Sequence, residues 1–482
     1  MPGGRSGPGS RSGHSWWWFA LLLSTACGFG RDPAPGIGQQ FSPRIERVLH
    51  QADLPAASGA PAARQAYWRQ NLERFYLLRR YQPAWVGPHG ALRQADDLLA
   101  VLAQGAAHGL PGDLYRLTQL KLAVRASRLG GSLSMLARLD VWLTETFIVY
   151  ADHQRRGLVD PRQLNPHWHV PDRPGDLAGL LTTSLSLHDI AGVVRRVAPR
   201  RPAYGELAHF LPAATGVDRS RLEANLERWR WLPRDLGSDY LLVRLAAFEL
   251  DWVRSGVKQS GRRVIIGEPF RRTPSFASQI TRLVVHPEWN VPTSIFKQEL
   301  IPKAQQDPEI LSRAGFQALR GDRPIDADQI DWSDPSQTVG LRLVQAPGGG
   351  NPLGRVKFQL PNPFSIFLHD TPSPSLFNQD GRDLSHGCVR VDGAVDLAQK
   401  ILGDTPSHAR FMALLESGET GTIHLAEPLP VFFIYWTVDV LDGQLRQLAD
   451  IYAEDAALMA ALEISTSSAH TRAWGEGFPA TP

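Results

Sequence analysis

Cysteine is almost absent from this sequence, which contains Cys27 and Cys388 and no other among its 482 residues. The excess of one charge over the other is also small: 51 Lys and Arg stand against 48 Asp and Glu, for a net charge of +3. No basic run is interleaved with aromatic residues, which argues against a nucleic-acid partner. After the first thirty residues, no stretch is long and apolar enough to anchor the chain in a membrane. What remains is a globular composition, 43% hydrophobic, in a chain long enough for two or three domains.

The first 27 residues have the pattern of a secretory signal. Arg5 and Arg11 precede the apolar run WWWFALLLSTA, which is shorter than the roughly 20 apolar residues of a membrane-spanning helix. Ser24 and Ala26 are small residues that suit cleavage before Cys27. The ending LSTAC also fits a lipoprotein signal, in which Cys27 would carry the lipid. The sequence therefore predicts export and leaves membrane attachment through a lipidated Cys27 open.

Removal or lipidation of Cys27 would leave Cys388 without a cysteine partner. An unpaired thiol in an exported protein is a candidate nucleophile, and the alternative is a buried cysteine that acts as a small apolar residue. A free thiol has a pKa of about 8.5, so a nucleophilic cysteine needs a base nearby. Two histidines are candidates: His386, two residues before Cys388, and His369, nineteen residues before it.

The residues around these histidines suggest how a site could form. In FSIFLHD (364–370) a period of two puts Phe364, Ile366 and Leu368 on one face of a strand and His369 at its end on the other. Gly387 permits a tight bend, in which the N–H groups of residues 387 and 388 could stabilise an oxyanion. A zinc site is a weaker alternative because its candidate ligands match no familiar zinc spacing, so we expect no metal and no cofactor. Those candidate ligands are His369, Asp370, His386 and Cys388.

The chain divides into regions of different composition and periodicity. Residues 28–65 are rich in Pro, Gly, Ala and Gln and predict a flexible tether, and the apolar spacing of three and four over 66–216 predicts a helical domain. Short strands predominate over 217–446, followed by a helix over 447–464 and a disordered tail over 465–482. The predicted fold class is α+β, a helical N-terminal domain followed by a mostly antiparallel β-rich domain.

Several shorter segments allow more local predictions. DGAVDLAQKILG (392–403) predicts a helix with Asp392 at its N-cap and Gly403 at its end. APGGGNPLG (346–354) lacks the Gly-Lys-Ser/Thr ending of a phosphate loop and is interpreted as a turn. ERWRWLP (227–233) is interpreted as an aromatic domain junction rather than a sugar-stacking surface. A lid is most plausible in the loop 371–384 or in residues 270–330.

The motif SHGCVR (385–390), preceded by FLHDTP (367–372), resembles the active site of the L,D-transpeptidase family, whose catalytic domain is of the YkuD type. Further segments resemble the large periplasmic branch of that family in the same order, among them NLERWRWLP, RRTPSFASQI, HPEWNVPTSI, NPLGRVKFQLPN and DIYAEDAAL. FYLLRRYQPAWV and YADHQRRGLVDP resemble the helical scaffold domain of that branch. The likeness covers roughly residues 66–460.

The resemblance implies a role for individual residues. Cys388 would be the nucleophile, His369 the general base, and Asp370 the residue whose backbone carbonyl holds the other imidazole nitrogen. The pocket and the oxyanion site would be shaped by Ser385, His386 and Gly387. Arg390 would fix the loop or a substrate carboxylate.

The resemblance also implies a substrate, the tetrapeptide stem of peptidoglycan. Cys388 would attack the diaminopimelate carbonyl, release D-alanine and pass the acyl group to a diaminopimelate amine of a second stem, in the periplasm. Carbapenems would be expected to acylate the same thiol. Transfer to water (an L,D-carboxypeptidase or hydrolase), attachment or release of an outer-membrane lipoprotein, and a non-catalytic wall-binding scaffold stay open as alternatives.

Two features depart from the family pattern. Phe367 stands where many relatives are expected to have tyrosine, so an oxyanion site assisted by that hydroxyl is in doubt. Residues 201–224 are too few for the helical peptidoglycan-binding module that larger members carry before the catalytic domain. Affinity for the wall would then depend on the scaffold domain and the catalytic cleft.

Overall fold

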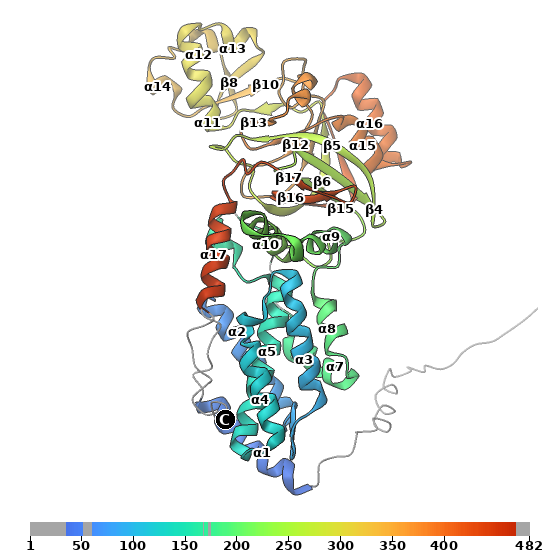
Figure 1. The fold of residues 1–482 in the computed structure, drawn as a ribbon. Helices are drawn as coiled ribbons and strands as arrows, with labels where there is room; N and C mark the ends of the chain where they lie inside the picture. Colours follow the sequence, from blue (N-terminus) through green and yellow to red (C-terminus); the bar gives the residue numbers. More distant parts are fainter. Residues whose placement is uncertain (1–34, 52–59, 167, 172–174, 469–482) are drawn as a thin grey trace, which may run out of the picture.

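The computed structural model of the chain describes residues 35–51, 60–166, 168–171 and 175–468. Helices fill its first half and strands dominate its second half, which confirms the predicted fold class. In Figure 1 the two halves are stacked end to end, with the helical half below the β-rich half. The predicted signal segment, with Cys27, lies outside the described residues, as does the predicted tail except for residues 465–468.

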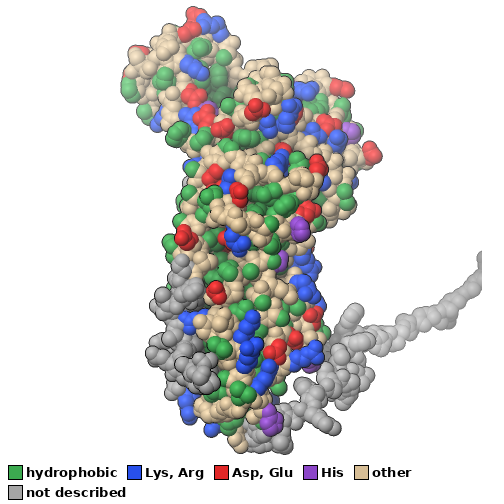
Figure 2. Space-filling model, viewed as in Figure 1, with side chains coloured by type: hydrophobic (Ala, Val, Ile, Leu, Met, Phe, Trp, Pro, Cys, Tyr) green, Lys and Arg blue, Asp and Glu red, His purple; other side chains and the backbone are tan. Residues whose placement is uncertain are grey.

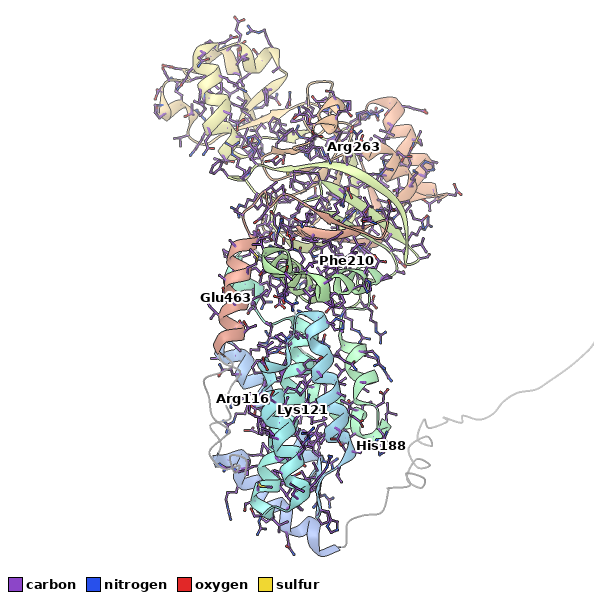
Figure 3. The ribbon with its side chains drawn as sticks, viewed as in Figure 1. Arg116, Lys121, His188, Phe210, Arg263 and Glu463 are labelled. Atoms are coloured by element: carbon purple, nitrogen blue, oxygen red, sulfur yellow. The ribbon has the colours of Figure 1, made fainter. Side chains whose placement is uncertain are left out.

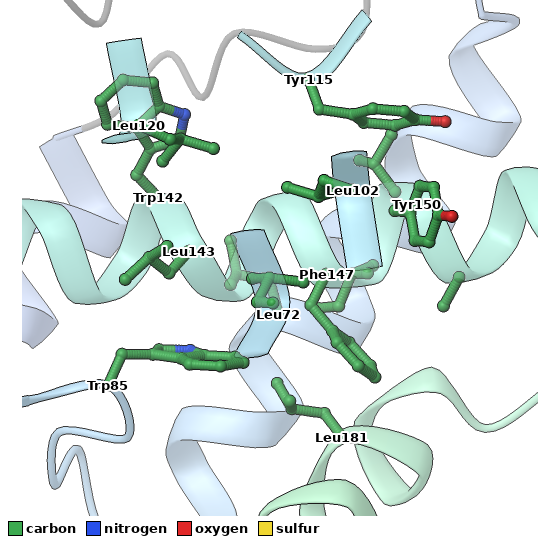
Figure 4. Packing of buried hydrophobic residues seen from close by; sticks show 14 of the residues in the cluster. Leu72, Trp85, Leu102, Tyr115, Leu120, Trp142, Leu143, Phe147, Tyr150 and Leu181 are labelled. Atoms are coloured by element: carbon green, nitrogen blue, oxygen red, sulfur yellow. The ribbon is translucent and has the colours of Figure 1, made fainter. Parts of the chain in front are cut away.

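The helical half is built around helix α5 (Leu133–Arg156), which carries buried residues on every side. A helix that is apolar all round needs neighbours all round. In Figure 4, Trp85 and Leu181 lie against Phe147 of α5, and the rings of Trp85 and Phe147 are 6.4 Å apart. The surrounding helices are α2 (Ala62–Leu78), α3 (Arg93–Gln104), α4 (Leu117–Leu129), α7 (Leu177–Leu187) and α8 (Ile190–Val197).

Helix α1 (Pro35–Gln51) occupies much of the segment that was predicted to be a flexible tether, so that prediction is wrong for these residues. Phe41, Ile45 and Leu49 are each four residues apart and form one apolar stripe of the helix. All three are at most 3% exposed, in the same core as α5. Burial of this stripe outweighs the glycine, proline and glutamine that suggested disorder.

Nine strands of the second half form one sheet, which closes into a barrel because β5 pairs with β14 on one side and with β4 on the other. The order is β13-β5-β14-β12-β11-β6-β15-β3-β4, and the pairs β12–β14, β13–β5 and β15–β3 are parallel. The other pairs are antiparallel, as predicted. The strands are β3 (Tyr240–Arg244), β4 (Glu249–Arg254), β5 (Val257–Gly267), β6 (Phe276–Val285), β11 (Val356–Gln359), β12 (Leu368–His369), β13 (Asp383–Ser385), β14 (Val389–Val391) and β15 (Gly421–Ile434).

Helices α15 (Ala394–Leu402) and α16 (Pro406–Ser417) follow β14. Gly393, with φ of 64°, occupies the N-cap position of α15 that was predicted for Asp392, so this prediction is wrong. The carboxylate of Asp392 instead binds the guanidinium of Arg263 on β5 at 2.7 Å, and Figure 3 labels Arg263 in the upper, β-rich half. A charged partner across the sheet competes with the cap for this side chain. Gly403 ends the helix as predicted, with φ of 55°.

An inserted subdomain, residues 289–345, lies between β6 and β11 and at the upper end of the molecule in Figure 1. Its four strands form a separate antiparallel sheet in the order β7-β10-β8-β9, and its helices pack on that sheet around Phe296, Trp332 and Leu343. The elements are α11 (Thr293–Ile295), α12 (Ile301–Gln306), α13 (Ile310–Arg313), α14 (Pro335–Thr338), β7 (Trp289–Asn290), β8 (Phe316–Arg320), β9 (Arg323–Ile325) and β10 (Leu341–Gln345). Residues 346–354 form turns, as predicted.

The two halves meet in an aromatic junction. Trp229 of α10 (Gly216–Arg230) stacks on Trp436 with ring centroids 3.9 Å apart, and Trp231 meets Trp168 edge to face at 5.4 Å. This agrees with the interpretation of residues 227–233 as a domain junction. Helix α9 (Pro202–Phe210) and the hairpin β16 (Val438–Leu441) and β17 (Gln444–Gln447) complete it, and Figure 3 labels Phe210 at this level.

Helix α17 (Asp455–Ser468) leaves the β-rich half and runs beside the helical half, where Figure 3 labels Glu463. Its Leu458 and Leu462 belong to the core of the helical half. Basic, acidic and apolar side chains are intermingled on the face shown in Figure 2. None of the helices in the described ranges is long and apolar enough to cross a membrane.

Candidate active site

The candidate residues gather where three neighbouring barrel strands run side by side. In the parallel pair β12–β14, Leu368 is opposite Val389 and His369 is opposite Arg390, while β11 places Lys357 opposite His369. Leu368 and Val389 point into the barrel core. Because side chains alternate along a strand, His369, Arg390 and Lys357 lie on the other face, and so does Cys388 immediately before β14.

The strand predicted over 364–369 is shorter than expected, since only Leu368–His369 is paired as β12. Asn362 explains the difference. Its side-chain oxygen accepts the N–H groups of Phe364 and Ile366, and its amide donates to the Ile366 carbonyl at 2.8 Å. These bonds shape a loop in which Ser365 has φ of 56°.

His369 is 4% exposed, and its Nδ1 lies 2.6 Å from the backbone carbonyl oxygen of Asp370. A carbonyl oxygen can only accept, so Nδ1 carries the proton and Nε2 keeps its lone pair. Burial lowers the pKa of His369 to about 4, against the hydrogen bonds to the backbone of Asp370 and Pro352, and the positive charges of Arg390 and Lys357 also lower it. The imidazole is therefore neutral near pH 7 and able to accept a proton at Nε2.

The Cys388 thiol is partly exposed, and its Sγ lies 3.7 Å from the carbonyl oxygen of Ser365. Burial raises the pKa of this thiol, against the opposing effects of the Phe367 backbone N–H and the charges of Lys357 and Arg390. The hydrogen-bond partners of the sulfur among the described residues are thus backbone groups of Ser365 and Phe367, and His369 is not among them. The thiol and imidazole thus share a face of two adjacent strands without a bond between them, and such bonds often form only when substrate binds.

Ser385, Gly387 and Thr273 fix the loop that carries the thiol. The Ser385 hydroxyl donates to the Cys388 carbonyl at 2.5 Å and accepts the Gly387 N–H at 3.1 Å, and Thr273 donates to the Gly387 carbonyl at 2.7 Å. Gly387 has φ of +112°, which agrees with the predicted tight bend. The Gly387 N–H, however, donates to the Ser385 hydroxyl. Of the two N–H groups predicted to stabilise an oxyanion, only the N–H of Cys388 donates to no described residue.

His386 reaches the inserted subdomain. Its Nε2 contacts the carboxylate of Glu299, which also binds Arg271 at 2.7 Å. Burial opposes ionisation of this carboxyl, but the bonds from His386 and Arg271 prevail and lower the pKa of Glu299. Glu299 therefore connects the inserted subdomain to the loop that bears Cys388, a contact that sequence spacing did not suggest.

Arg390 is half-buried, and its guanidinium has no hydrogen-bond or ion-pair partner among the described residues. The carboxylate of Asp370 instead accepts the Arg355 N–H at 2.9 Å. The four residues considered as zinc ligands therefore do not converge: His386 and Asp370 are directed to other partners.

Lys357 is a residue that the sequence analysis missed. Its ammonium nitrogen lies 3.6 Å from the centroid of the Phe367 ring, at the position where the family was expected to have tyrosine. Burial lowers the pKa of Lys357, which the negative charge of an ionised Cys388 would oppose. The alternation in GRVKFQL could have identified this residue. Val356 and Phe358 flank Lys357, which puts its charge on the non-core face of a buried strand.

A cavity of about 610 Å³ lies beside the loop, between the two halves of the molecule. Ile366 and His386 from the candidate site, Trp168 and Trp231 from the junction, and Glu454 contribute to its wall. Cys388 and His369 are not among its lining residues, so the cavity adjoins the candidate site through Ile366 and His386. A concave space of this size can hold part of a substrate.

Comparison with known proteins identifies both halves. The scaffold domain family matches residues 70–211, and the YkuD family, the L,D-transpeptidase catalytic domain, matches residues 238–416. A curated protein of Haemophilus influenzae named "Putative L,D-transpeptidase" is 27% identical over 391 residues, which are 80% of this chain and 78% of that protein.

A solved structure, that of the Ldtfm-avibactam carbamoyl enzyme, is 12% identical and covers 42% of this chain. This chain spans 51% of that one, with a TM-score of 0.21. The two family matches together span more than half of the chain, in the order scaffold domain and then catalytic domain. The chain belongs to the L,D-transpeptidase family, as a member that joins a scaffold domain to a YkuD catalytic domain.

Proposed function

We propose that this protein is a peptidoglycan L,D-transpeptidase that uses Cys388 as its nucleophile and His369 as its general base. The observation that carries the proposal is the imidazole of His369. It is buried, held with Nε2 unprotonated, and lies on the same face of a YkuD barrel as Cys388. A neutral imidazole beside a thiol is the arrangement that nucleophilic cysteine catalysis needs.

In the first step, Nε2 of His369 takes the thiol proton as Cys388 Sγ attacks the diaminopimelate carbonyl of a tetrapeptide stem. The oxyanion that forms meets the N–H of Cys388. When the carbon–nitrogen bond to D-alanine breaks, the imidazolium returns its proton to the leaving amine. The product is a thioester between Cys388 and the shortened stem.

In the second step, the side-chain amine of a diaminopimelate on another stem attacks the thioester. His369 accepts the amine proton, the carbon–sulfur bond breaks, and the thiolate regains a proton. The half-buried Arg390, which has no described partner, is suited to bind a stem carboxylate next to the reacting carbonyl. The bond formed is a diaminopimelate-to-diaminopimelate cross-link.

Mass analysis of products tests this proposal. Incubated with tetrapeptide-rich wall fragments, the protein should release D-alanine and form cross-linked dimers, and Cys388→Ala should form none. Tripeptides without dimers would identify water as the acceptor and make the protein an L,D-carboxypeptidase instead. An absence of both products would exclude an enzyme acting on this substrate and favour a wall-binding scaffold.

The same thiol should react with carbapenems. The intact protein should gain the mass of one carbapenem molecule, and Cys388→Ala should gain none. This substrate is found outside the cytoplasm, so we further propose that the chain acts in the periplasm after export through its N-terminal signal segment.

A further inference from the structure

We propose that a second, arginine-lined cavity at the junction of the two halves binds a carboxylate-rich peptide stem of the wall, apart from the stem that reacts at Cys388. The proposal rests on the proposed function, because that function brings wall peptides to this chain. The cavity has a volume of about 950 Å³ and lies among the start of α2, the end of α5, the segment before α9 and the end of α10.

The wall of this cavity carries a large excess of positive charge. Among the described residues that line it, eight are arginines and two are acidic, Asp160 and Asp235. Basic side chains that line a concave surface reinforce one another's field and attract anions. The net charge of the whole chain is +3, so the excess is a local feature of this cavity.

Part of the charge is neutralised within the protein. Arg64 and Arg156 bind the buried carboxylate of Asp152 at 2.8 and 2.7 Å, and Arg230 binds Glu227 at 2.9 Å. Arg230 is 1% exposed, yet its Nε has no partner among the described residues. A buried N–H without an acceptor is costly.

Arg200 and Arg234 supply charge that no ion pair between described residues neutralises. Both are exposed, and neither has an ion pair with a described residue. Burial and the neighbouring positive charges of Arg200 and Arg155 lower the pKa of Arg234. These guanidinium groups repel one another across one end of the cavity, and a bound anion would relieve that repulsion.

The shape of the cavity favours a peptide over a small anion. The guanidinium fork matches both carboxylates and phosphates. A volume of this size holds a ligand of several residues, and a tetrapeptide stem offers several free carboxylates along its length. Pro161, Trp168 and Trp231 are shared with the 610 Å³ cavity that reaches His386. A stem held by the arginines would therefore keep its glycan strand close to the reaction site. Such binding would compensate for the wall-binding module, for which residues 201–224 are too few.

Calorimetry on the full chain tests this assignment. With Cys388→Ala to prevent turnover, a disaccharide-tetrapeptide should bind at two places, the reaction site, which takes the donor and acceptor stems, and the arginine-lined cavity. Adding Arg200→Gln and Arg234→Gln should remove one of these sites, and raised salt should weaken the same site. Arg138→Gln is the matched control, since Arg138 is an exposed arginine of α5 outside the cavity, and it should keep both sites. Replacement of Arg200 and Arg234 by lysine should retain much of the binding.

Two results would overturn the proposal. The first is an unchanged number of bound tetrapeptides in the variant with both glutamine substitutions. The second is binding of inorganic phosphate in the cavity that excludes the tetrapeptide, since the natural ligand would then carry a phosphate group, as a lipid headgroup does. Product analysis of the wild-type chain separates this proposal from the proposed function. Binding at the arginines without cross-linked product would contradict the transferase, and cross-linking with only one binding site would contradict the second cavity.

Discussion

Both members of the Cys388–His369 pair are uncharged in this structure at neutral pH. Burial raises the pKa of the thiol and lowers the pKa of the imidazole to about 4. A preformed thiolate–imidazolium pair would need the opposite shifts. Proton transfer to Nε2 should therefore accompany attack on the carbonyl, and the thiol should be less reactive toward general alkylating agents than toward its substrate.

The pH dependence of acylation tests this state of His369. We expect the acid limb of kcat/KM for carbapenem acylation to have an apparent pKa of about 4, because His369 accepts a proton only while it is neutral and burial keeps it neutral down to that pH. The rate should change little from pH 7 to 5 and fall below that. A midpoint near 6.5, the value of a free imidazole, would contradict the assignment. His89→Gln, an exposed control, should leave the profile unchanged.

Lys357 should assist ionisation of the thiol. Its ammonium group lies over the Phe367 ring on the face that carries Cys388, and its charge lowers the pKa of the thiol. Lys357→Met should shift the pH profile of Cys388 alkylation to higher pH and slow the reaction at pH 7 by about fivefold to tenfold. A purely structural lysine would change stability without moving the profile. Lys303→Met, on the inserted subdomain, provides an exposed control.

At this scale the sequence was informative where a motif is local and uninformative where a contact is distant. SHGCVR and FLHDTP pointed to Cys388 and His369, and the Asp370 carbonyl lies where the resemblance implied. Glu299 reaches His386 from 87 residues away, so no spacing could suggest it. The roles of Cys388, His369 and Arg390 in the reaction stay predictions.

Among the secondary-structure elements, the bend between β13 and β14 depends most on a single residue type. Gly387 combines φ of +112° with close packing, since a Cβ there would lie 3.0 Å from Cδ1 of Ile366. Gly387→Ala should lower the free energy of unfolding by about 1–3 kcal/mol. The acylation rate should fall by more than stability alone explains, because the bend orients Cys388.

Urea unfolding and acylation kinetics would measure both effects. Gly349→Ala is the matched control, because its Cβ would enter open space and its backbone is not in the left-handed region. Equal stability and acylation rate for Gly387→Ala and the wild type would show that the bend tolerates a side chain.

Other elements show why local patterns can mislead. The composition of residues 28–65 indicated a tether. The stripe formed by Phe41, Ile45 and Leu49 is nevertheless buried, because it packs on the apolar surface of the helical core, which the local composition does not reveal. Asp392 had the right residue type for an N-cap, yet Arg263, 129 residues away, binds its carboxylate. The barrel strands were found from their alternation, whereas their order depends on pairings that alternation does not encode.

At the scale of the whole molecule, helix α17 ties the scaffold domain to the catalytic barrel. Its first residue, Asp455, is 4% exposed and binds Arg228 of α10 at 2.6 Å and the hydroxyl of Thr437 at 2.9 Å. One turn further, Leu458 enters the core of the helical half. A single helix therefore bonds at its start to α10 and to Thr437, which follows β15 of the barrel, and packs on the scaffold domain along its length. Its Ala457 and Leu458 also line the 610 Å³ cavity.

This connection predicts a large effect from one uncharged replacement. Asp455→Asn keeps the shape of the side chain but leaves the guanidinium of Arg228, 4% exposed, without its buried countercharge. Because an unpaired buried charge is costly, we expect the free energy of unfolding to fall by about 3 kcal/mol or more. Asp396→Asn, which removes a half-exposed partner of Arg262 and Lys400, should cost less than about 1 kcal/mol. Calorimetry should also resolve two transitions in Asp455→Asn, because the halves are no longer clamped at this point. A single transition with unchanged stability would mean that the aromatic junction alone unites the two halves.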